Sequence, residues 1–391
     1  MIKLNKNIIF LGIVSFLTDL SSEMIFPLLP VFLDHFLKAT KFEIGIIEGT
    51  AQLVASLLKV FSGYISDMAG RKKPLVVIGY SLSAISKPFL YFAGSWKDVL
   101  VIRAVERTGK GIRTSPRDAL ISSYTTPESS GRAFGFHRGM DTAGAVLGTL
   151  VAIFFLFYFG ETEDTFRLVF LISAVPAFLA VLFLVFFVRE KKSVYHRKTI
   201  RPSLKKIPSG FYIFLIFQVL FTVFSMNFAF MLLKANYSGV SLGLIPAVYL
   251  FFNLVYAVAS YPAGAVADRA GKLNILIATY ILFGITALLF TGGNFIWAWA
   301  GFMFYGLFMA GNEVASRAVI SDLISEEIKG SAYGIYHTAT GVSAFVSSSL
   351  AGFLWDRFGE NTPFYVASAG AFVLALAAYF IFSKKKILKI S

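Results

Sequence analysis

Charged side chains recur at helical spacing in the segment RAVERTGKGIRTSPRDAL, residues 103–120. The row comprises Arg103, Glu106, Arg107, Lys110, Arg113 and Arg117, and Asp118 follows directly. Separations of three or four residues place these groups along one broad side of an α-helix. Such a row can bind an anionic group or, together with carboxylates, take part in proton transfer.

Carboxylates in other apolar segments are candidates for carrying a proton. They are Asp19, Glu23, Glu48 and Asp141. A carboxylate suits this task when burial and a nearby cation act on it in opposite directions, because a change of environment then changes its protonation. Asp19 is the first choice, since it lies in the middle of its apolar segment.

The elements that position these groups must be membrane helices. Of the 391 residues, 57% are hydrophobic and 15% charged, and 43 are Phe, a composition that argues against a soluble protein. A spanning helix needs roughly 20 apolar residues, because lipid offers no hydrogen-bond partner to the backbone. The chain has no Cys, which excludes disulfides, a thiolate nucleophile and Cys-ligated metal.

Polar and Gly/Pro breaks divide the chain into about twelve apolar segments. They lie near residues 8–33, 43–66, 74–93, 98–122, 135–159, 166–188, 209–233, 241–266, 273–291, 295–320, 332–355 and 363–382. If the N-terminus is cytoplasmic, most Lys and Arg outside the apolar segments fall on the cytoplasmic side, which predicts that both termini lie there. This bias accounts for most of the +14 net charge, so no nucleic-acid partner is expected.

The chain contains an internal duplication. GYISDMAGRKKP from Gly63 is matched by GAVADRAGKLNI from Gly264, and GRAFGFHR from Gly131 by GSAYGIYH from Gly330. The polar run 189–208 separates the two copies and is expected to be a cytoplasmic linker between an N-terminal six-helix bundle, 1–188, and a C-terminal one, 209–391. Duplication of a six-span unit is a transporter architecture.

The loop after the second segment carries the pattern G-x-x-x-D-x-x-G-R-K. It is met by Gly63, Asp67, Gly70, Arg71 and Lys72, with a weaker copy at Gly264, Asp268, Arg269, Gly271 and Lys272. With these motifs the chain resembles the major facilitator superfamily, and its drug/proton antiporters in particular. The resemblance implies an all-α membrane fold of twelve helices in two pseudo-symmetric bundles, a central cavity and alternating access.

The resemblance also implies a gating role for this loop, in which Asp67 grips the start of the eleventh helix. The gating candidates are Gly63, Asp67, Gly70, Arg71, Lys72, Arg113, Arg117, Asp118, Arg138, Asp268 and Arg269. Of these, Arg113, Arg117 and Asp118 are expected to form an ion-pair network with Asp67 and Arg138. The alternative is that these cations reach lipid phosphates. The antiporter pattern G-x-x-x-G-P-x-x-G-G is only partly kept, since Gly144 and Gly148 are present but Ala145 stands at the Pro position.

Polar residues deeper in the segments are candidates for substrate contact. They are Arg103, Glu106, Arg107, Lys110, Gln52, Gln218, Asn227, Asn253, Asn312 and Glu313. The alternatives are a static buried ion-pair cluster for the charged group and interhelical hydrogen bonding for the amides. Lys38 and Lys41 are expected to be plain loop charges.

Together these features predict a secondary active transporter, not an enzyme, that couples protons to efflux of a small amphiphilic or anionic organic compound. An importer or facilitator of a charged metabolite, metal chelate or lipid is the alternative. A membrane-embedded hydrolase is a remote one, suggested by the spacing of Ser56 and Lys59. We expect a monomer in the bilayer, in a bacterial inner membrane, with substrate and protons as partners and no cofactor.

Overall fold

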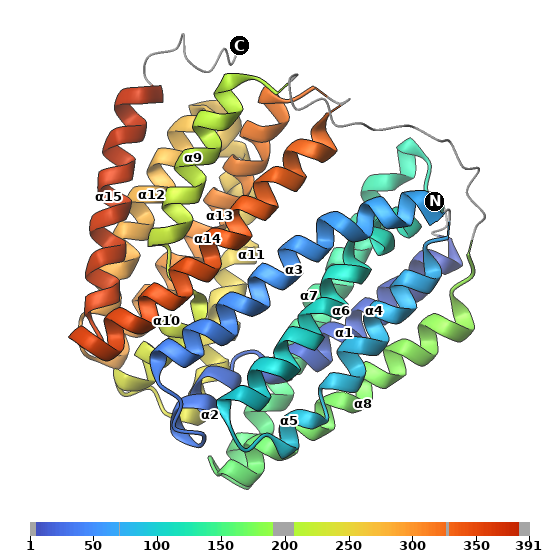
Figure 1. Ribbon diagram of the computed structural model, residues 1–391, viewed down its shortest axis with the longest axis horizontal. Helices are drawn as coiled ribbons and strands as arrows, with labels where there is room; N and C mark the ends of the chain where they lie inside the picture. Colours follow the sequence, from blue (N-terminus) through green and yellow to red (C-terminus); the bar gives the residue numbers. More distant parts are fainter. Residues whose placement is uncertain (1–4, 70, 191–206, 326–327, 383–391) are drawn as a thin grey trace. The chain divides into compact units, whose positions relative to one another are not determined.

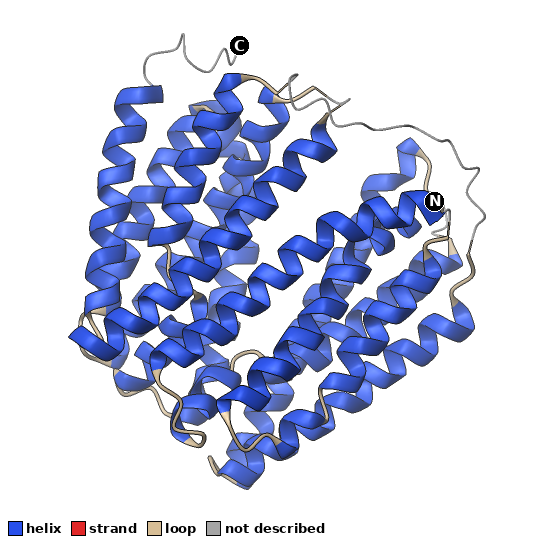
Figure 2. Cartoon of the chain, viewed as in Figure 1, coloured by secondary structure: helices blue, strands red, loops and turns tan. Residues whose placement is uncertain are grey.

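The computed structural model describes residues 5–69, 71–190, 207–325 and 328–382, apart from the side chains of a few helical residues, Asp67 and Asp268 among them. The described residues contain helices and no strand (Figure 2). The helices are α1 (Lys6–Ile25), α2 (Leu29–His35), α3 (Lys41–Ala69), α4 (Lys73–Ser86), α5 (Phe89–Phe92), α6 (Trp96–Ser123), α7 (Pro127–Phe159), α8 (Glu163–Phe187), α9 (Ser209–Phe224), α10 (Phe228–Tyr237), η2 (Leu242–Leu244), α11 (Ile245–Ala270), α12 (Lys272–Phe290), α13 (Phe295–Leu323), α14 (Lys329–Phe358) and α15 (Thr362–Phe382) (Figure 1).

The twelve predicted segments correspond to these helices, and the predicted fold class is confirmed. Three segments are interrupted: α1 and α2, α4 and α5, and α9 and α10 each share one. Within the described residues, nine of these segments are long and apolar enough to cross a membrane, judged by length and composition. The other three, α6, α13 and α14, are more polar, and α6 contains the charged row.

Local sequence explains where several helices begin and break. Ser95 and Asp98 form a capping box at the start of α6, and Asn294 accepts hydrogen bonds from two backbone N–H groups at the start of α13. Asn227 caps α10 after the break that ends α9. Pro88 lies two residues after the end of α4, where a proline cannot continue the helical hydrogen bonding.

The two halves use the same helix pairings. In the first half, α1 packs against α7 and α8, and α4 against α6 and α8. In the second, α9 packs against α14 and α15, and α12 against α13 and α15. The internal duplication of the sequence is therefore also a duplication of packing.

Two compact units account for the chain. One comprises residues 1–39, 50–199 and 242–247, and the other comprises residues 40–49, 200–241 and 248–391. Thr40 and the first nine residues of α3, 41–49, thus group with the second unit, whereas the rest of α3 groups with the first. The predicted linker 189–208 lies largely outside the described residues, which resume at Ile207.

Glycines allow the closest helix crossings of the first unit. A Cβ built on Gly79 of α4 would lie 2.6 Å from the backbone oxygen of Gly109 on α6. Gly144 and Gly148 of α7 likewise face the backbone of Phe16 and Leu20 on α1. Small residues at such crossings let membrane helices pack backbone to backbone.

Candidate transport site

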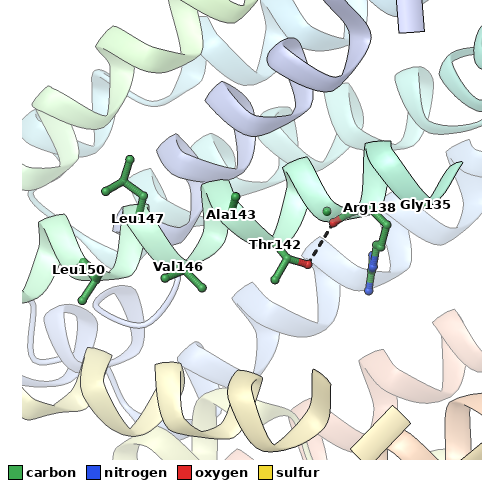
Figure 3. A pocket seen from close by; sticks show the side chains of 8 residues that line it. Gly135, Arg138, Thr142, Ala143, Val146, Leu147 and Leu150 are labelled. Atoms are coloured by element: carbon green, nitrogen blue, oxygen red, sulfur yellow. Dashed lines mark hydrogen bonds between the residues drawn. The ribbon is translucent and has the colours of Figure 1, made fainter. Parts of the chain in front are cut away.

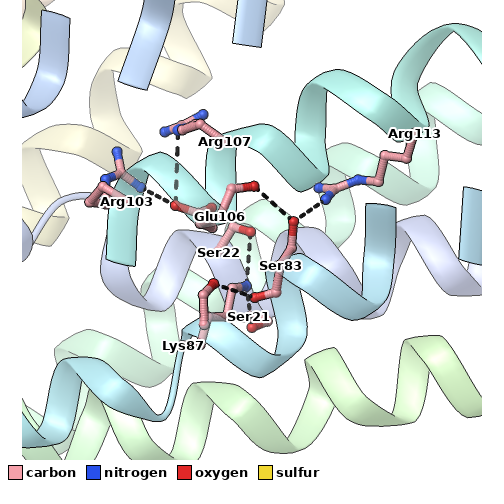
Figure 4. A network of polar contacts seen from close by, with 9 residues as sticks. Ser21, Ser22, Ser83, Lys87, Arg103, Glu106, Arg107 and Arg113 are labelled. Atoms are coloured by element: carbon pink, nitrogen blue, oxygen red, sulfur yellow. Dashed lines mark hydrogen bonds and ion pairs between the residues drawn. The ribbon is translucent and has the colours of Figure 1, made fainter. Parts of the chain in front are cut away.

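Three members of the charged row of α6, Arg103, Glu106 and Arg107, form an ion-pair cluster (Figure 4). Arg103 lies 2.5 Å from one carboxylate oxygen of Glu106, and the Nε of Arg107 lies 3.9 Å from the same oxygen. Arg103 is only 3% exposed, and Glu106 is buried as well. A buried carboxylate between two guanidinium groups recovers part of its desolvation cost through charge-assisted hydrogen bonding.

Side chains of α4 connect this cluster to the next turns of α6. Ser83 donates a hydrogen bond to the backbone carbonyl of Glu106 at 3.0 Å and accepts one from Arg113 at 2.5 Å. The guanidinium carbon of Arg113 lies 4.5 Å from the centre of the Tyr80 ring, a cation–π contact. The close crossing at Gly79 and Gly109 brings these groups together.

Lys87 at the end of α4 is a buried cation bound by hydroxyl groups. Its side chain is 2% exposed, and its Nζ donates to the hydroxyls of Ser21 at 2.5 Å and Ser22 at 3.1 Å on α1 (Figure 4). The charges that act on it over longer distances include those of Glu106, Asp19 and Glu23. The ammonium therefore lies between carboxylates of two helices without a carboxylate as its hydrogen-bond partner.

Asp19 and Asp141 belong to one electrostatic cluster. The charges that act on Asp19 are those of Asp141, Lys110, Arg117 and Arg113, which come from α6 and α7. Asp141 itself accepts a hydrogen bond from Ser15 of α1 and lies 3.5 Å from the Nδ1 of His137, one turn earlier on α7. Two of the four predicted proton carriers are thus brought together.

The remaining predicted residues of this half differ in burial. Glu48 is buried in the part of α3 that groups with the second unit, whereas Gln52 is exposed. Lys110 is exposed on α6, in contrast to Arg103 and Arg113. Glu23 is half-buried near Lys87.

The described part of the predicted gating network contains two sets of contacts. Arg117 pairs with its sequence neighbour Asp118 at 2.9 Å, and Arg113 contacts the Ser83 hydroxyl and the Tyr80 ring. Arg138 is exposed and lines a pocket along one face of α7, beside Thr142 and Val146 (Figure 3). The side chain of Asp67, its expected partner, lies outside the described part, as do Gly70 and the side chain of Asp268.

The basic loop after α3 is held by helix ends. The Nζ of Lys72 donates to the backbone carbonyl of Ala119 at 3.1 Å, and that of Lys73 to the carbonyl of Val185 at 2.8 Å. Cations are favoured there, because the last carbonyls of a helix carry partial negative charge. Arg71 and Arg269 are exposed, and Gly63 of α3 packs against the Ser115 side chain of α6.

Lys41 was expected to be a plain loop charge, and this expectation is wrong. Its side chain is buried, its Nζ donates to the Tyr237 hydroxyl at 3.0 Å, and its backbone N–H donates to Asp356 at 3.0 Å. Asp356 also accepts from the backbone of Phe42, so it satisfies two N–H groups at the start of α3. The pattern of loop charges alone gave no indication of this tertiary cap.

The second unit has a smaller polar cluster. Glu313 of α13 accepts hydrogen bonds from Tyr256 of α11 and from Arg317 one turn along its own helix. Gln218 donates to Ser316 at 3.0 Å, while Asn253 donates to the carbonyl of Tyr249 at 3.0 Å within α11.

Two further amides of the second unit have different surroundings. The side chain of Asn227 accepts from the backbone of Ala229, which makes this residue a helix cap. The Oδ1 of Asn312 is buried and has no hydrogen-bond partner among the described residues.

Comparison with known proteins identifies the chain's family. The family model described as Major Facilitator Superfamily matches residues 11–252 and, in a second alignment, residues 213–389. The chain belongs to the major facilitator superfamily. It is an integral, multi-pass membrane protein of a family of transporters.

Relatives and solved structures agree with this assignment. An uncharacterized MFS-type transporter of Methanocaldococcus jannaschii is 36% identical over 391 residues, which cover 97% of this chain and 96% of the relative. The multidrug resistance protein MdtH of Proteus mirabilis is 23% identical over 389 residues, or 97% of this chain and 95% of MdtH. The nucleoside transporter NupG has the same fold at 15% identity, with a TM-score of 0.81 over 97% of this chain and 99% of NupG.

Sequence reasoning did not select four residues of the site as functional candidates. They are Ser15, Ser83, Lys87 and His137. Their signal in the sequence is weak, because a serine or a single histidine in an apolar helix has many ordinary roles. His137 lies in the repeated GRAFGFHR motif, directly before Arg138, and this position was the one available clue. No group of three potential metal ligands occurs in the described part of the chain.

Proposed function

We propose that this transporter works by alternating access and exports a small organic compound, amphiphilic or anionic, in exchange for protons. The observation that carries the proposal is the cluster in which Asp141, Lys110, Arg113 and Arg117 act on Asp19, while Arg117 also acts on Asp141. Ionisable groups at membrane depth are costly, by at least about 2.5 kcal/mol each on insertion scales. A family member that keeps two acids and three cations in one place is expected to use them.

Export is supported by similarity to MdtH, whose name describes it as a multidrug resistance protein. The substrate preference follows from charge: Arg103, Arg107, Lys110 and Arg113 outnumber the one acid of the row, Glu106. An exposed Lys110 beside buried guanidinium groups suits a carboxylate or phosphate on a small organic molecule.

Import of a charged metabolite, a metal chelate or a lipid is the second candidate, and the same cationic row favours it. NupG, a nucleoside transporter, shares the fold, as does a D-xylose–proton symporter at 15% identity and a TM-score of 0.72. Under this alternative, Arg103→Ala and Arg107→Ala should each abolish binding of the anionic substrate. Binding retained in both variants would argue against the cationic row as an anion site.

The gating residues, the orientation and the monomeric state remain part of the proposal. The loop from Gly63 to Lys72 and its copy near Asp268 would act at the cytoplasmic ends of the helices, with both termini on that side. Arg113, Arg117, Asp118 and Arg138 would change partners between conformations. The backbone carbonyls of Ala119 and Val185, which accept hydrogen bonds from Lys72 and Lys73, are partners that this loop could exchange during the transport cycle.

The test uses purified protein in proteoliposomes. Thermal-shift screening against a panel of metabolites and drugs selects a transported compound, and its flux is then measured with and without an imposed pH gradient. We expect gradient-driven flux, reduced about tenfold or more in Asp19→Asn or Glu23→Gln. Asp164→Asn, at the exposed start of α8, is the matched control. Flux that ignores the gradient and survives both variants would remove the proton from the mechanism.

A further inference from the structure

His137 of α7 is buried beside one of the proposed proton carriers. Its side chain is 4% exposed, and its Nδ1 lies 3.5 Å from Oδ2 of Asp141. The other carboxylate oxygen, Oδ1, accepts a hydrogen bond from the Ser15 hydroxyl of α1. Ser15 therefore fixes the carboxylate, and its second oxygen is left facing the imidazole.

The second ring nitrogen of His137, Nε2, is available to bind a proton. Nε2 of His137 is buried and has no hydrogen-bond partner among the described residues. Each ring nitrogen can carry a proton, and the ring is charged when both do. With a proton on Nδ1, directed at Asp141, a further proton on Nε2 would make an imidazolium whose charge the carboxylate balances.

The charged groups around this pair come from two neighbouring helices. Arg117 of α6 and Asp19 of α1 both act electrostatically on Asp141. The other elements that pack against α7 are α8 and η2. From Leu168 to Phe187, α8 contains no ionisable residue, and η2 is Leu-Gly-Leu. The charged neighbours given for Asp141 on these elements are therefore Asp19 and Arg117.

We propose that His137 and Asp141 share one exchangeable proton and that this pair carries a proton that drives transport. A protonated Asp141 gives its proton from Oδ2 to Nδ1 of a neutral His137 that bears its hydrogen on Nε2. The products are a carboxylate and an imidazolium, which then releases the Nε2 proton, so charge and protons balance. The counterpart of His137 in the second half, 199 positions on, is Tyr336, whose phenol keeps its proton near neutral pH. The inference rests on the proposed proton-coupled transport.

Nuclear magnetic resonance of histidine tests the shared proton without a substrate. The chain has four His, so selective ¹⁵N labelling of the imidazoles in lipid nanodiscs gives few signals, and His137→Gln identifies the one of interest. Between about pH 5 and 9 we expect the His137 signal to titrate, with a midpoint that Asp141→Asn changes by about one pH unit or more. A His137 signal that does not titrate, or an unchanged midpoint, would overturn the proposal.

Two substitutions separate proton transfer from a structural role. The amide nitrogen of Asn can replace Nδ1 as a donor to Asp141 but cannot carry the proton, so His137→Asn keeps the contact. We expect His137→Asn and His137→Gln both to reduce pH-driven flux about tenfold, with flux under a substrate gradient alone kept within about twofold. His35→Gln, on the short helix α2, is the control.

The outcomes distinguish the two proposals. Wild-type flux that ignores the pH gradient would remove proton coupling itself, whatever the resonance data show. If gradient-driven flux survives in His137→Asn, proton coupling stands but this pair does not carry the proton. A hydrogen-bond donor to Asp141 would then be sufficient at position 137.

Discussion

Individual residues of the first unit show how charges are kept inside apolar helices. Glu106 is held between two arginines of its own helix, whereas Lys87 is held by the hydroxyls of Ser21 and Ser22. Hydroxyl groups accept hydrogen bonds from the ammonium without neutralising it.

Replacing Glu106 by Gln should destabilise the protein strongly. The change removes the carboxylate that lies 2.5 Å from the buried guanidinium of Arg103, and losing one partner of a buried ion pair costs about 3–5 kcal/mol. We expect a clear drop in Tm, measured by thermal unfolding in detergent.

Glu163→Gln provides the comparison, because Glu163 forms a similar pair with Arg167 at 2.6 Å but its side chain is 44% exposed. Exposed pairs contribute only about 0–1 kcal/mol. Equal losses of Tm in the two variants would contradict the view that the Glu106 cluster is a buried charge network.

At the scale of helices, close crossings decide which polar groups meet. The crossing of α4 and α6 at Gly79 and Gly109 brings Ser83 into reach of Arg113. The glycines of α7 serve the same purpose against α1, where Asp141 meets Ser15. Packing and electrostatics in this unit are therefore linked through small residues.

Gly79→Ala should separate α4 from α6. The added methyl would meet the backbone oxygen of Gly109, which cannot move aside as a flexible side chain could, so we expect a loss of about 1–3 kcal/mol. The measurement is Tm in detergent together with proton-driven flux.

Gly131→Ala in α7 is the matched control, because a Cβ there meets nothing within 4 Å. It should leave the protein unchanged or stabilise it by up to about 1 kcal/mol through helix propensity. A neutral Gly79→Ala would mean that the crossing is looser than its geometry indicates.

At the scale of the whole molecule, the distribution of Lys and Arg predicts the orientation in the membrane. Because the chain has no Cys, a single introduced cysteine reports its side of the membrane without background. Lys97→Cys lies at the start of α6 and Arg132→Cys near the start of α7, and both positions are exposed.

A membrane-impermeant maleimide should label Lys97→Cys in intact cells and Arg132→Cys only in inverted vesicles. The reason is that the predicted orientation places Arg132 among the Lys and Arg residues on the cytoplasmic side, and Lys97 on the outer side. The opposite labelling pattern would invert the proposed orientation and, with it, the side on which the loop from Gly63 to Lys72 acts.

The sequence alone determined the class of the protein, because apolar length, positive loops and a repeat at nearly constant offset do not depend on tertiary contacts. It predicted the fold, the charged row of α6 and the candidates Asp19 and Asp141. Helical periodicity also identified the turns on which these groups lie.

Only the tertiary structure decided the partners of those groups. Ser15 and Asp141 are 126 positions apart in the chain, and Lys87 and Ser21 are 66 apart. Periodicity defines one side of one helix, but the side that a neighbouring helix presents depends on crossings such as Gly79 with Gly109. For that reason the sequence contained no indication of the tyrosine ring and the serine hydroxyl that the fold places beside Arg113.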